Sequence, residues 1–522
     1  MSEDKKKPKE KALSRPYSYH TFIFPFIWNQ DGKISMKQFE KCKHPCWVEE
    51  KWEDAPFDKE RYGQYCYFNE PTRKLIFPQK EVQDATVHSF CFDFGKLIQK
   101  TGDAQESDWL KSPKDERNPV RYIIEKDIYR YNPKTKKDEI SEHFHASLPV
   151  NGIRLKLFTT GVGIIVFELE NYTCPDEKLI NRINEFGRRV FAPYLDPDNR
   201  CSVCADEISL VYPKGKVAAR ISGRAPEKNS DVRVMEPILF LLRGEEYSAT
   251  TNPSPSKKEF YIEPIIDDRM FVACAWNSDT FVKEMSEQVE GEYAYLADAK
   301  NKAPDADDSA ARRLYELMFV DGTGTSCYSR TMLHDMLTEH IYHRWIECGT
   351  ITGITEFSMI TVTNFFPGIT SFLMMYIEMA IVVLAQRASL LAFDRQISNC
   401  ARGKRRIEQL HQSYILFQSK MLLRELTPQQ QGIEMYDLLK KNLFIDKEES
   451  DLEDQIESLF ALENSISERS DNWLLFTLAA LGIVETVDIL LQAEGIWNGI
   501  LSAAGVIVLI ALFCFNHRKR LR

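Results

Sequence analysis

The sequence predicts an α+β domain, then long stalk helices, then a hairpin of two transmembrane helices. Three observations support this fold class. The chain of 522 residues is acidic and mostly polar, with a formal net charge of −10 and a mean hydropathy of −0.35. Its C-terminal third contains long stretches with few helix breakers. Two strongly apolar runs then follow one another closely, just before the chain ends in basic residues.

Composition limits the function classes before any motif is considered. The acidic net charge argues against a protein that binds nucleic acid directly, because such proteins carry a basic excess. The twelve cysteines show no disulfide-like rhythm, and no signal peptide opens the chain. We therefore expect residues 1–15 to form a flexible cytoplasmic tail, and the thiols to be reduced.

Residues 16–340 read as an α/β cytoplasmic sensor domain. The stretch RLKLFTTGVGIIVFELEN alternates in polarity and breaks at Gly161 and Gly163, which predicts a strand–turn–strand hairpin. DEKLINRINEFGRRV follows as a helix, with acids early and Arg188 and Arg189 late, as the helix dipole favours. Further strands are predicted in three stretches, which are RYIIEKDIYRYN, RVMEPILFLLRG and EFYIEPIIDDRMFVACAW.

Candidate ligand-binding residues come from glycine-rich turns and arginines. The turn at Gly161 and Gly163 offers amides that could face a phosphate, but a plain hairpin turn is the favoured reading because no Walker lysine follows it. DGTGTSCYSR at 321–330 is a second such turn. Arginine offers a bidentate fork to anions, and a cluster of arginines with an amide and an indole would strengthen the case. The candidate ligand-binding residues are Gly161, Gly163, Asn184, Arg188, Arg189, Arg344 and Trp345.

Metal-binding and catalytic motifs are weak. CKHPC at 42–46 and CSVC at 201–204 have zinc-ligand spacing, but they lie far apart in the sequence. HFH at 143–145 places two imidazoles on one strand face, and HDMLTEHIYH at 334–343 places Asp335, Glu339 and His343 on one helix face. The chain lacks HExxH, GxSxG and the protein-kinase motifs. We therefore predict neither a metal site nor an enzyme.

Residues 341–472 are predicted to form a helical stalk. Thr370 to Glu425 is interrupted only by Gly403, and Pro428 marks a turn before a shorter helix. Ser450 to Leu491 contains no proline and runs directly into the first apolar run.

One segment of this region has two readings. Ile369 to Gln386 carries a single charge, Glu378, and is apolar enough for a third membrane span or for a buried helix. Three spans would place the large N-terminal part outside the cell, so the buried reading is favoured.

Residues 473–516 are predicted to form two transmembrane helices. Trp473–Leu491 and Ile496–Phe515 each approach the ~20 residues that cross a bilayer, and the second run carries no charge. The basic tail at 517–522 belongs in the cytoplasm by the positive-inside rule, so both termini are expected there. The protein is therefore predicted to be a multi-pass protein of the lipid bilayer.

The first span carries a polar face. Charges exposed to lipid near a helix centre cost ~2.5–3.5 kcal/mol each, so intramembrane acids usually face a bundle interior or a water-filled path. We therefore expect an oligomer whose first spans surround a cation pore, unless the acids reach the outer headgroups instead. The predicted pore-lining residues are Thr477, Glu485, Asp488 and Gln492, with Glu494, Gly495 and Asn498 at the pore mouth.

This order of segments resembles that of CorA-type divalent cation transporters. The family combines a large cytoplasmic domain, a stalk continuous with the first span, a tight loop and a second span, and its members are pentamers. Its Gly-Met-Asn motif has only a partial counterpart here, because GIWN at Gly495–Asn498 has an extra residue and no methionine. The resemblance implies a homopentamer. The altered motif argues against the selectivity for hydrated magnesium that the family's own motif provides.

Four stretches are similar to a divergent CorA-like subgroup associated with bacterial type III CRISPR loci. They are LFTTGVGIIVFELENY, INEFGRRVFAPYL, HRWIECGTITGITEFSMI and LAQRASLLAFDRQI. This resemblance implies a bacterial inner-membrane channel or pore, gated in antiviral defence by a nucleotide second messenger of the S-adenosylmethionine–AMP type. Two alternatives stay open, which are an ordinary magnesium or cobalt transporter of the CorA type and a membrane-anchored scaffold protein.

Overall fold

The computed structural model describes most of the chain up to residue 491. The described ranges are 15–28, 36–52, 56–78, 86–100, 119–173, 175–198, 200–213, 215–221, 234–243, 262–302, 306, 309–322, 326–398 and 404–491. The chain divides into two compact units. The first, called the body here, comprises Met1–Gln396 and Ile415–Ser450, and the second comprises Ile397–Tyr414 and Asp451–Arg522. Each unit is described by itself.

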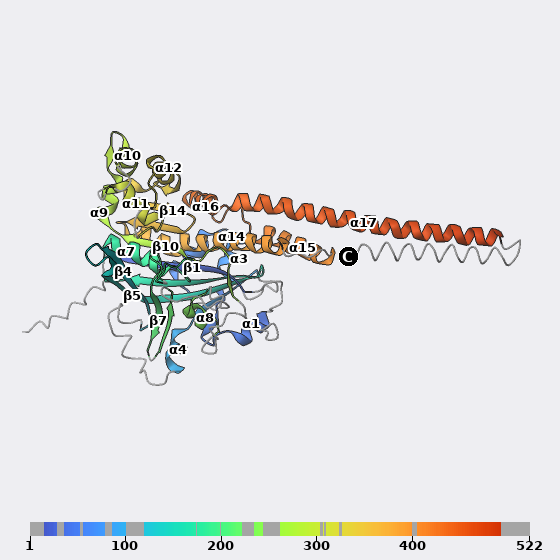
Figure 1. The fold of residues 1–522 in the computed structure, drawn as a ribbon, viewed down its shortest axis with the longest axis horizontal. Coiled ribbons are helices and arrows are strands. Elements are labelled where there is room, and N and C mark those ends of the chain that lie inside the picture. Colours follow the sequence, from blue (N-terminus) through green and yellow to red (C-terminus); the bar gives the residue numbers. More distant parts are fainter. Residues whose placement is uncertain are drawn as a thin grey trace, which may run out of the picture. The chain divides into compact units, whose positions relative to one another are not determined.

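A 13-stranded mixed sheet forms the frame of the body (Figure 1). Its main path is β13-β14-β15-β10-β1-β6-β5-β4-β7-β8, while β2, β3 and β9 pair beside it. All pairings are antiparallel except that of β10 with β15. The bounds are β1 Ser18–Ile27, β2 Trp47–Glu49, β3 Val87–Phe92, β4 Arg121–Asn132, β5 Lys137–Phe158, β6 Val162–Asn171, β7 Glu207–Tyr212, β8 Gly215–Arg220, β9 Glu263–Pro264, β10 Phe271–Asn277, β13 Ile341–Tyr342, β14 Thr350–Ile354 and β15 Ser358–Thr363, with a separate pair of β11 Gln288–Val289 and β12 Glu292–Tyr293.

The central strands are buried on both faces. In β1 nine of ten residues are buried, and β6 and β10 are nearly as enclosed. A strand covered on both faces reads as a continuous apolar run rather than an alternating one, which explains sequences such as FIFPFI and FVACAW. These strands join the main hydrophobic core.

Helices lie between the strands in the sequence from α1 to α12, and those from α13 onward follow the last strand. Several begin at a side-chain cap, such as Asp176, whose carboxylate accepts from the Leu179 amide at 3.0 Å at the start of α7. The bounds are α1 Met36–Cys42, α2 Lys59–Tyr67, α3 Glu70–Ile76, α4 Phe94–Lys100, α7 Glu177–Gly187, α8 Glu236–Arg243, α9 Asp279–Ser286, α10 Ala294–Asn301, α11 Ala310–Met318, α12 Arg330–His340, the 3₁₀ turn Ile346–Cys348, α13 Phe366–Ser371, a π-helix Phe372–Tyr376, α14 Ile377–Ser398, α15 Lys404–Lys420, α16 Gln430–Asn442 and α17 Ile445–Leu491.

The apolar segment around Glu378 is a core helix of the body. Among the described residues, Phe366–Ser398 is the one helix long and apolar enough to cross a membrane, and 61% of its most apolar stretch is buried. Glu378 on α14 forms ion pairs with Arg154 and Lys156 of β5, and Ser389 hydrogen-bonds Thr160 at 2.8 Å. These contacts hold α14 against the sheet, as the buried reading of this segment requires.

The structure differs from the sequence-based prediction in three places. RVMEPILFLLRG forms helix α8 rather than a strand, because Pro237 suits a first helical turn and residues 238–242 are all buried in the core. The last strands, β13 to β15, lie beyond residue 340, so the sheet extends into the segment assigned to the stalk. Helix α12 ends at His340, so His343 does not share its face with Asp335 and Glu339.

Helix α17 confirms the long helix that the sequence predicts. It runs for 47 residues from Ile445 and includes the apolar run Trp473–Leu491. In the second unit, its Phe460 ring stacks on His411 of α15, with centroids 4.4 Å apart. The Thr477 hydroxyl donates to the Trp473 carbonyl. The side chains of Glu485 and Asp488, and all of Gln492, Glu494, Gly495, Asn498 and the second predicted span, lie outside the described part of the structure.

Candidate ligand site

The glycines of the β5–β6 turn have a packing role. Gly161 has a φ of +85°, its carbonyl accepts from the Trp28 amide at 3.0 Å, and its own amide donates to the Phe158 carbonyl at 3.0 Å. At Gly163 an added Cβ would lie 2.6 Å from the Phe26 ring, so this position requires glycine for close packing. The Gly161 amide is therefore already bound within the fold, and Gly163 is explained by close packing. Both observations weaken the prediction of a phosphate site at this turn.

Asn184 lies inside the body. It is buried on α7, and its side-chain oxygen accepts a hydrogen bond from His20 Nδ1 at 2.7 Å. Burial lowers the pKa of His20 to about 4, so the imidazole is neutral at physiological pH. Asn184 thus positions a core histidine between β1 and α7.

Arg344 and Trp345 lie in a different part of the body. Arg344 forms an ion pair with Glu434 of α16 at 2.6 Å, and Tyr342 donates to the same carboxylate at 2.6 Å. The Arg344 guanidinium carbon also lies 5.6 Å from the centre of the Trp345 indole. Within the described residues, no contact joins this pair to Asn184, Arg188 or Arg189, so these candidates do not form one cluster.

Arg188 and Arg189, by contrast, both lie in a buried layer of charges. Arg188 is 3% exposed, and its Nη2 donates to the Val320 carbonyl at 2.9 Å. Its Nε and Nη1 have no hydrogen-bond partner among the described atoms. Burial, with the nearby charges of Arg269 and Arg189, lowers the pKa of Arg188 to about 9. Arg189 is instead paired with the carboxylate of Asp268.

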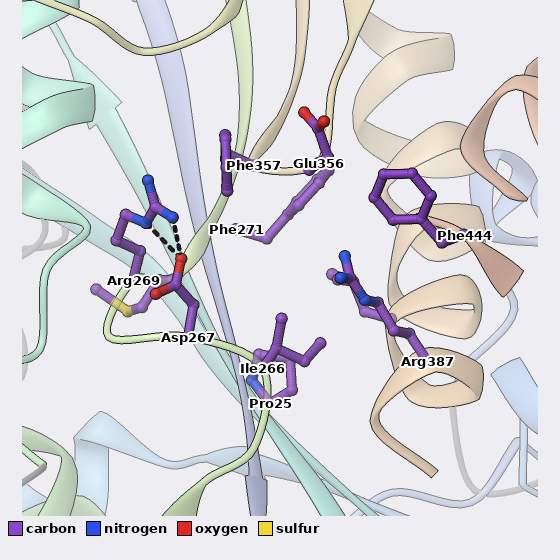
Figure 2. A pocket seen from close by; sticks show the side chains of 11 residues that line it. Pro25, Ile266, Asp267, Arg269, Phe271, Glu356, Phe357, Arg387 and Phe444 are labelled. Atoms are coloured by element: carbon purple, nitrogen blue, oxygen red, sulfur yellow. Dashed lines mark hydrogen bonds and ion pairs between the residues drawn. The ribbon is translucent and has the colours of Figure 1, made fainter. Parts of the chain in front are cut away.

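Next to this layer is a cavity of about 260 Å³, called here the Phe357 cavity (Figure 2). Figure 2 shows Arg269 and Asp267 on one side of it, with Arg387 and Phe444 facing them from the other. The Arg269 guanidinium carbon stacks over the Phe357 ring at 3.9 Å from its centroid. That of Arg188 lies 5.9 Å from the same ring. Phe357 therefore connects the buried arginine layer to the cavity.

The far wall of the cavity is the junction of α16 and α17. Phe444 occupies this junction with a φ of +56°, and its carbonyl accepts from the Glu448 amide at 3.0 Å. The Arg387 guanidinium carbon lies 5.5 Å from the Phe444 ring centroid, and its Nε lies 3.7 Å from a Glu448 carboxylate oxygen. Burial raises the pKa of Glu448, and Arg387 opposes that effect. The first turn of α17 is thus part of the cavity's surroundings.

These groups define what the cavity can recognise. Two phenylalanine rings, Phe357 and Phe444, can stack on a planar heteroaromatic ring. Arg269 and Arg387 can bind phosphate or carboxylate groups through their guanidinium forks. Asp267 and Glu356 also line the cavity and can receive positively charged groups. The arrangement suits a ligand that combines an aromatic base, an anionic group and a cation.

Metal-ligand motifs do not assemble in the described part of the chain, which holds no group of three or more His, Cys, Asp or Glu side chains placed for a metal. The two imidazoles of HFH pair with Asp127 and Glu125 across the hairpin. Cys201 and Cys204 are both buried, and a hydrogen bond with Cys204 lowers the pKa of Cys201 to about 6.

Sequence reasoning missed four residues of the cavity. Arg269, Phe357, Arg387 and Phe444 come from four separate places in the chain, and only the fold brings them together. A signal existed for two of them. Arg387 is a charge inside the apolar run of α14, and Arg269 follows two aspartates directly before a buried strand. Charges in such surroundings need partners, and here the partners lie around the cavity.

Comparisons of the chain with protein-family models, with curated proteins and with solved structures found no match. The function is therefore inferred from the residues and geometry described above, together with the sequence of the apolar C-terminal runs.

Proposed function

We propose that this protein is a CorA-like membrane effector in which a nucleotide bound in the Phe357 cavity controls a homo-oligomeric cation channel or pore. The observation that carries the proposal is the position of Phe444 and Glu448. Both contact Arg387 at the cavity, and both belong to the start of α17, the helix that contains the apolar run Trp473–Leu491. A ligand at this point can act on the helix that would enter the membrane.

The coupling follows from the weak Arg387–Glu448 pair. At 3.7 Å the contact is longer than a hydrogen bond, so a phosphate that binds Arg387 competes with it directly. When a phosphate binds Arg387, the half-buried Glu448 carboxylate loses its counter-charge. A carboxylate without a counter-charge favours a more solvated position, which would move the first turn of α17. Ligand binding thereby shifts the conformational equilibrium at the base of α17.

The ligand class follows from the charges of the cavity. In a conjugate of the S-adenosylmethionine–AMP type, an adenine ring can stack on Phe357 or Phe444, and the phosphate can bind Arg269 and Arg387. The sulfonium and ammonium groups of the same molecule would face Asp267 and Glu356. Together with the family resemblance, a messenger of this type supports a role in type III CRISPR antiviral defence. The same resemblance supports a homopentamer in the bacterial inner membrane.

Calorimetry on the full-length protein in detergent tests this proposal. We expect S-adenosylmethionine–AMP to bind one site per chain, and Arg269→Ala to weaken binding at least tenfold. Arg182→Ala is the matched control, because Arg182 forms a surface ion pair with Glu142 away from the cavity. If neither this conjugate nor cyclic oligoadenylates bind the folded protein, the nucleotide-gated effector is ruled out.

Ion flux then separates the remaining readings. An ordinary magnesium or cobalt transporter would carry those ions into proteoliposomes without nucleotide, and a membrane-anchored scaffold would carry none under either condition. The effector is expected to release monovalent or divalent cations only after the nucleotide is added.

A further inference from the structure

A second cavity of about 250 Å³ lies elsewhere in the body and is called here the Glu378 cavity. The sheet contributes Arg154 and Lys156 from β5, and α14 contributes Glu378 from the opposite side. Glu378 is 3% exposed and forms ion pairs with both basic side chains. Burial by itself would raise the pKa of Glu378, but Arg154 and Lys156 outweigh burial and lower it to about 2. The carboxylate is therefore ionised at every physiological pH.

Three buried polar atoms at this cavity have no hydrogen-bond partner among the described atoms. They are Glu378 Oε2, Arg154 Nε and Ser89 Oγ. Glu378 Oε2 lies 3.5 Å from Lys156, and Arg154 Nε lies 2.8 Å from Glu168, so both are near opposite charge without a well-aligned hydrogen bond. Buried polar groups in proteins are ordinarily hydrogen-bonded, and a donor and an acceptor left open at one cavity indicate a ligand that offers both.

Part of the cavity wall is apolar. Phe77, directly after α3, and Phe90 of β3 line it, together with Leu373 and Met374 of the π-helix. The Met374 carbonyl accepts from Gln64 of α2, which fixes the wider π turn to the neighbouring helix. π-helical turns inside α-helices occur frequently at functional sites. The cavity therefore presents charges at one part of its wall and hydrocarbon at another.

The charges at the cavity balance in sign. Three cations line it, and three carboxylates accompany them. The cations are Arg61, Arg154 and Lys156, and the carboxylates are Glu50, Glu168 and Glu378. A net anion or a net cation gains little from such a wall, whereas a zwitterion can pair with both signs. The volume lies just below the roughly 300–1,000 Å³ of pockets for drug-sized ligands, so it suits a smaller molecule.

We propose that the Glu378 cavity binds a free α-amino acid with an apolar side chain. The carboxylate of the ligand accepts from Arg154 and Ser89, its ammonium group donates to Glu378, and its side chain packs against the wall formed with Phe77 and Phe90. This inference concerns a cavity whose lining residues differ from those of the Phe357 cavity, and it does not rest on the proposed nucleotide response.

Calorimetry on the full-length protein in detergent, without nucleotide, tests the proposal. The probes are L-methionine, L-leucine, L-phenylalanine and L-glutamate, with N-acetyl-L-methionine and L-methionine methyl ester as derivatives that lack one charge. We expect at least one apolar amino acid to bind at one site per chain. Each blocked derivative is expected to bind at least tenfold more weakly, since it lacks one of the two ionic contacts.

Two variants locate the binding site. Ser89→Ala removes one hydrogen bond to the ligand and is expected to weaken binding roughly five- to tenfold. Glu378→Gln removes the partner of the ammonium group and is expected to weaken it further. Glu142→Gln is the matched control, because it neutralises a surface glutamate that pairs with Arg182.

Several results would overturn the proposal. They are the absence of binding of any of the four amino acids at millimolar concentration, equal binding of the blocked derivatives, or unchanged binding by Ser89→Ala. Should Glu378→Gln fail to fold because Arg154 and Lys156 lose their counter-charge, Ser89→Ala decides the question, since it leaves the ion pairs intact. A failure of nucleotide binding has no bearing on these measurements.

Discussion

Arg387 and Glu448 connect the core helix α14 to the first turn of α17, with Arg387 Nε 3.7 Å from a Glu448 carboxylate oxygen. Arg387 also lies over the Phe444 ring at the junction of α16 and α17. The Arg387 side chain belongs to the core helix α14 and lines the Phe357 cavity. It also contacts the beginning of α17, the helix that contains the apolar run. Four predictions follow from this region and its surroundings.

Arg387→Ala is expected to remove the response to nucleotide. It deletes one anion-binding group of the cavity and leaves Glu448 without its counter-charge. We expect nucleotide affinity to fall at least tenfold by calorimetry. Arg395→Ala is the control on the same helix, because Arg395 pairs with Glu263 at 3.1 Å at a more exposed position. Equal affinity of the two variants would contradict the assignment of Arg387 to the ligand site.

Arg188→Met and Arg189→Met are expected to change stability in opposite directions. Arg188 is a buried cation with two nitrogens that lack hydrogen-bond partners among the described atoms. A methionine of similar length is therefore expected to raise the free energy of unfolding by about 1 kcal/mol or more, and with it the melting temperature. Arg189→Met removes the ion-pair partner of the buried Asp268 carboxylate and is expected to lower the free energy of unfolding by about 3–5 kcal/mol. Thermal melts of the full-length protein measure both. A lower melting temperature for Arg188→Met would contradict the view of Arg188 as a buried cation with two unpaired nitrogens.

Acidification is expected to destabilise the body through His20. Its folded pKa of about 4 lies below the ordinary 6.5, so the unfolded state binds the proton more readily and stability falls as the pH drops from about 6.5 to 4. Asp268 has a folded pKa raised to about 6, which gives the opposite slope between about 6 and 3.8. The measurement is therefore a comparison of wild type with His20→Gln across pH 7 to 4.5, in which the variant loses less stability. Parallel melting curves would contradict the buried neutral imidazole.

The double variant Glu485→Ala/Asp488→Ala is expected to abolish nucleotide-triggered cation release from proteoliposomes while membrane insertion is retained. The reason is the predicted polar face of the first span, where these acids would face the pore. Asp451→Ala/Asp454→Ala is the matched control, because these exposed acids have the same three-residue spacing on the same helix. Undiminished release by the first double variant would exclude a pore lined by these carboxylates.

Local signals in the sequence predicted several elements correctly. The hairpin around Gly161, helix α7 after Asp176 and the long helix to Leu491 depend on turn residues, caps and the absence of breakers, which act over a few residues. The strand predicted at 233–244 is the helix α8, since a short apolar run has no periodicity that separates a buried strand from a buried helix.

The candidate site was predictable only in part. Arg188 and Arg189 are correctly grouped because they are neighbours in the chain, and both belong to the charge layer beside Phe357. Arg344 and Trp345 were candidates of the same kind, and the fold pairs Arg344 with Glu434 at 2.6 Å. Phe444 could not be found from sequence, since its role arises from a φ of +56° at a helix junction and from its distance to Arg387.

The order of strands in the sheet has a consequence for synthesis of the chain. Strand β1 pairs with β10, whose residues follow about 250 positions later, and the sheet is complete only when β15 has been made. At about 5–20 residues per second, the ribosome needs several more seconds to translate from Thr363 to the apolar run at Trp473. The long-range strand pairing therefore has several seconds to form before the apolar run is made. An insertion that slows closure of β1 onto β10 would leave strand edges unpaired at the time when that apolar run emerges.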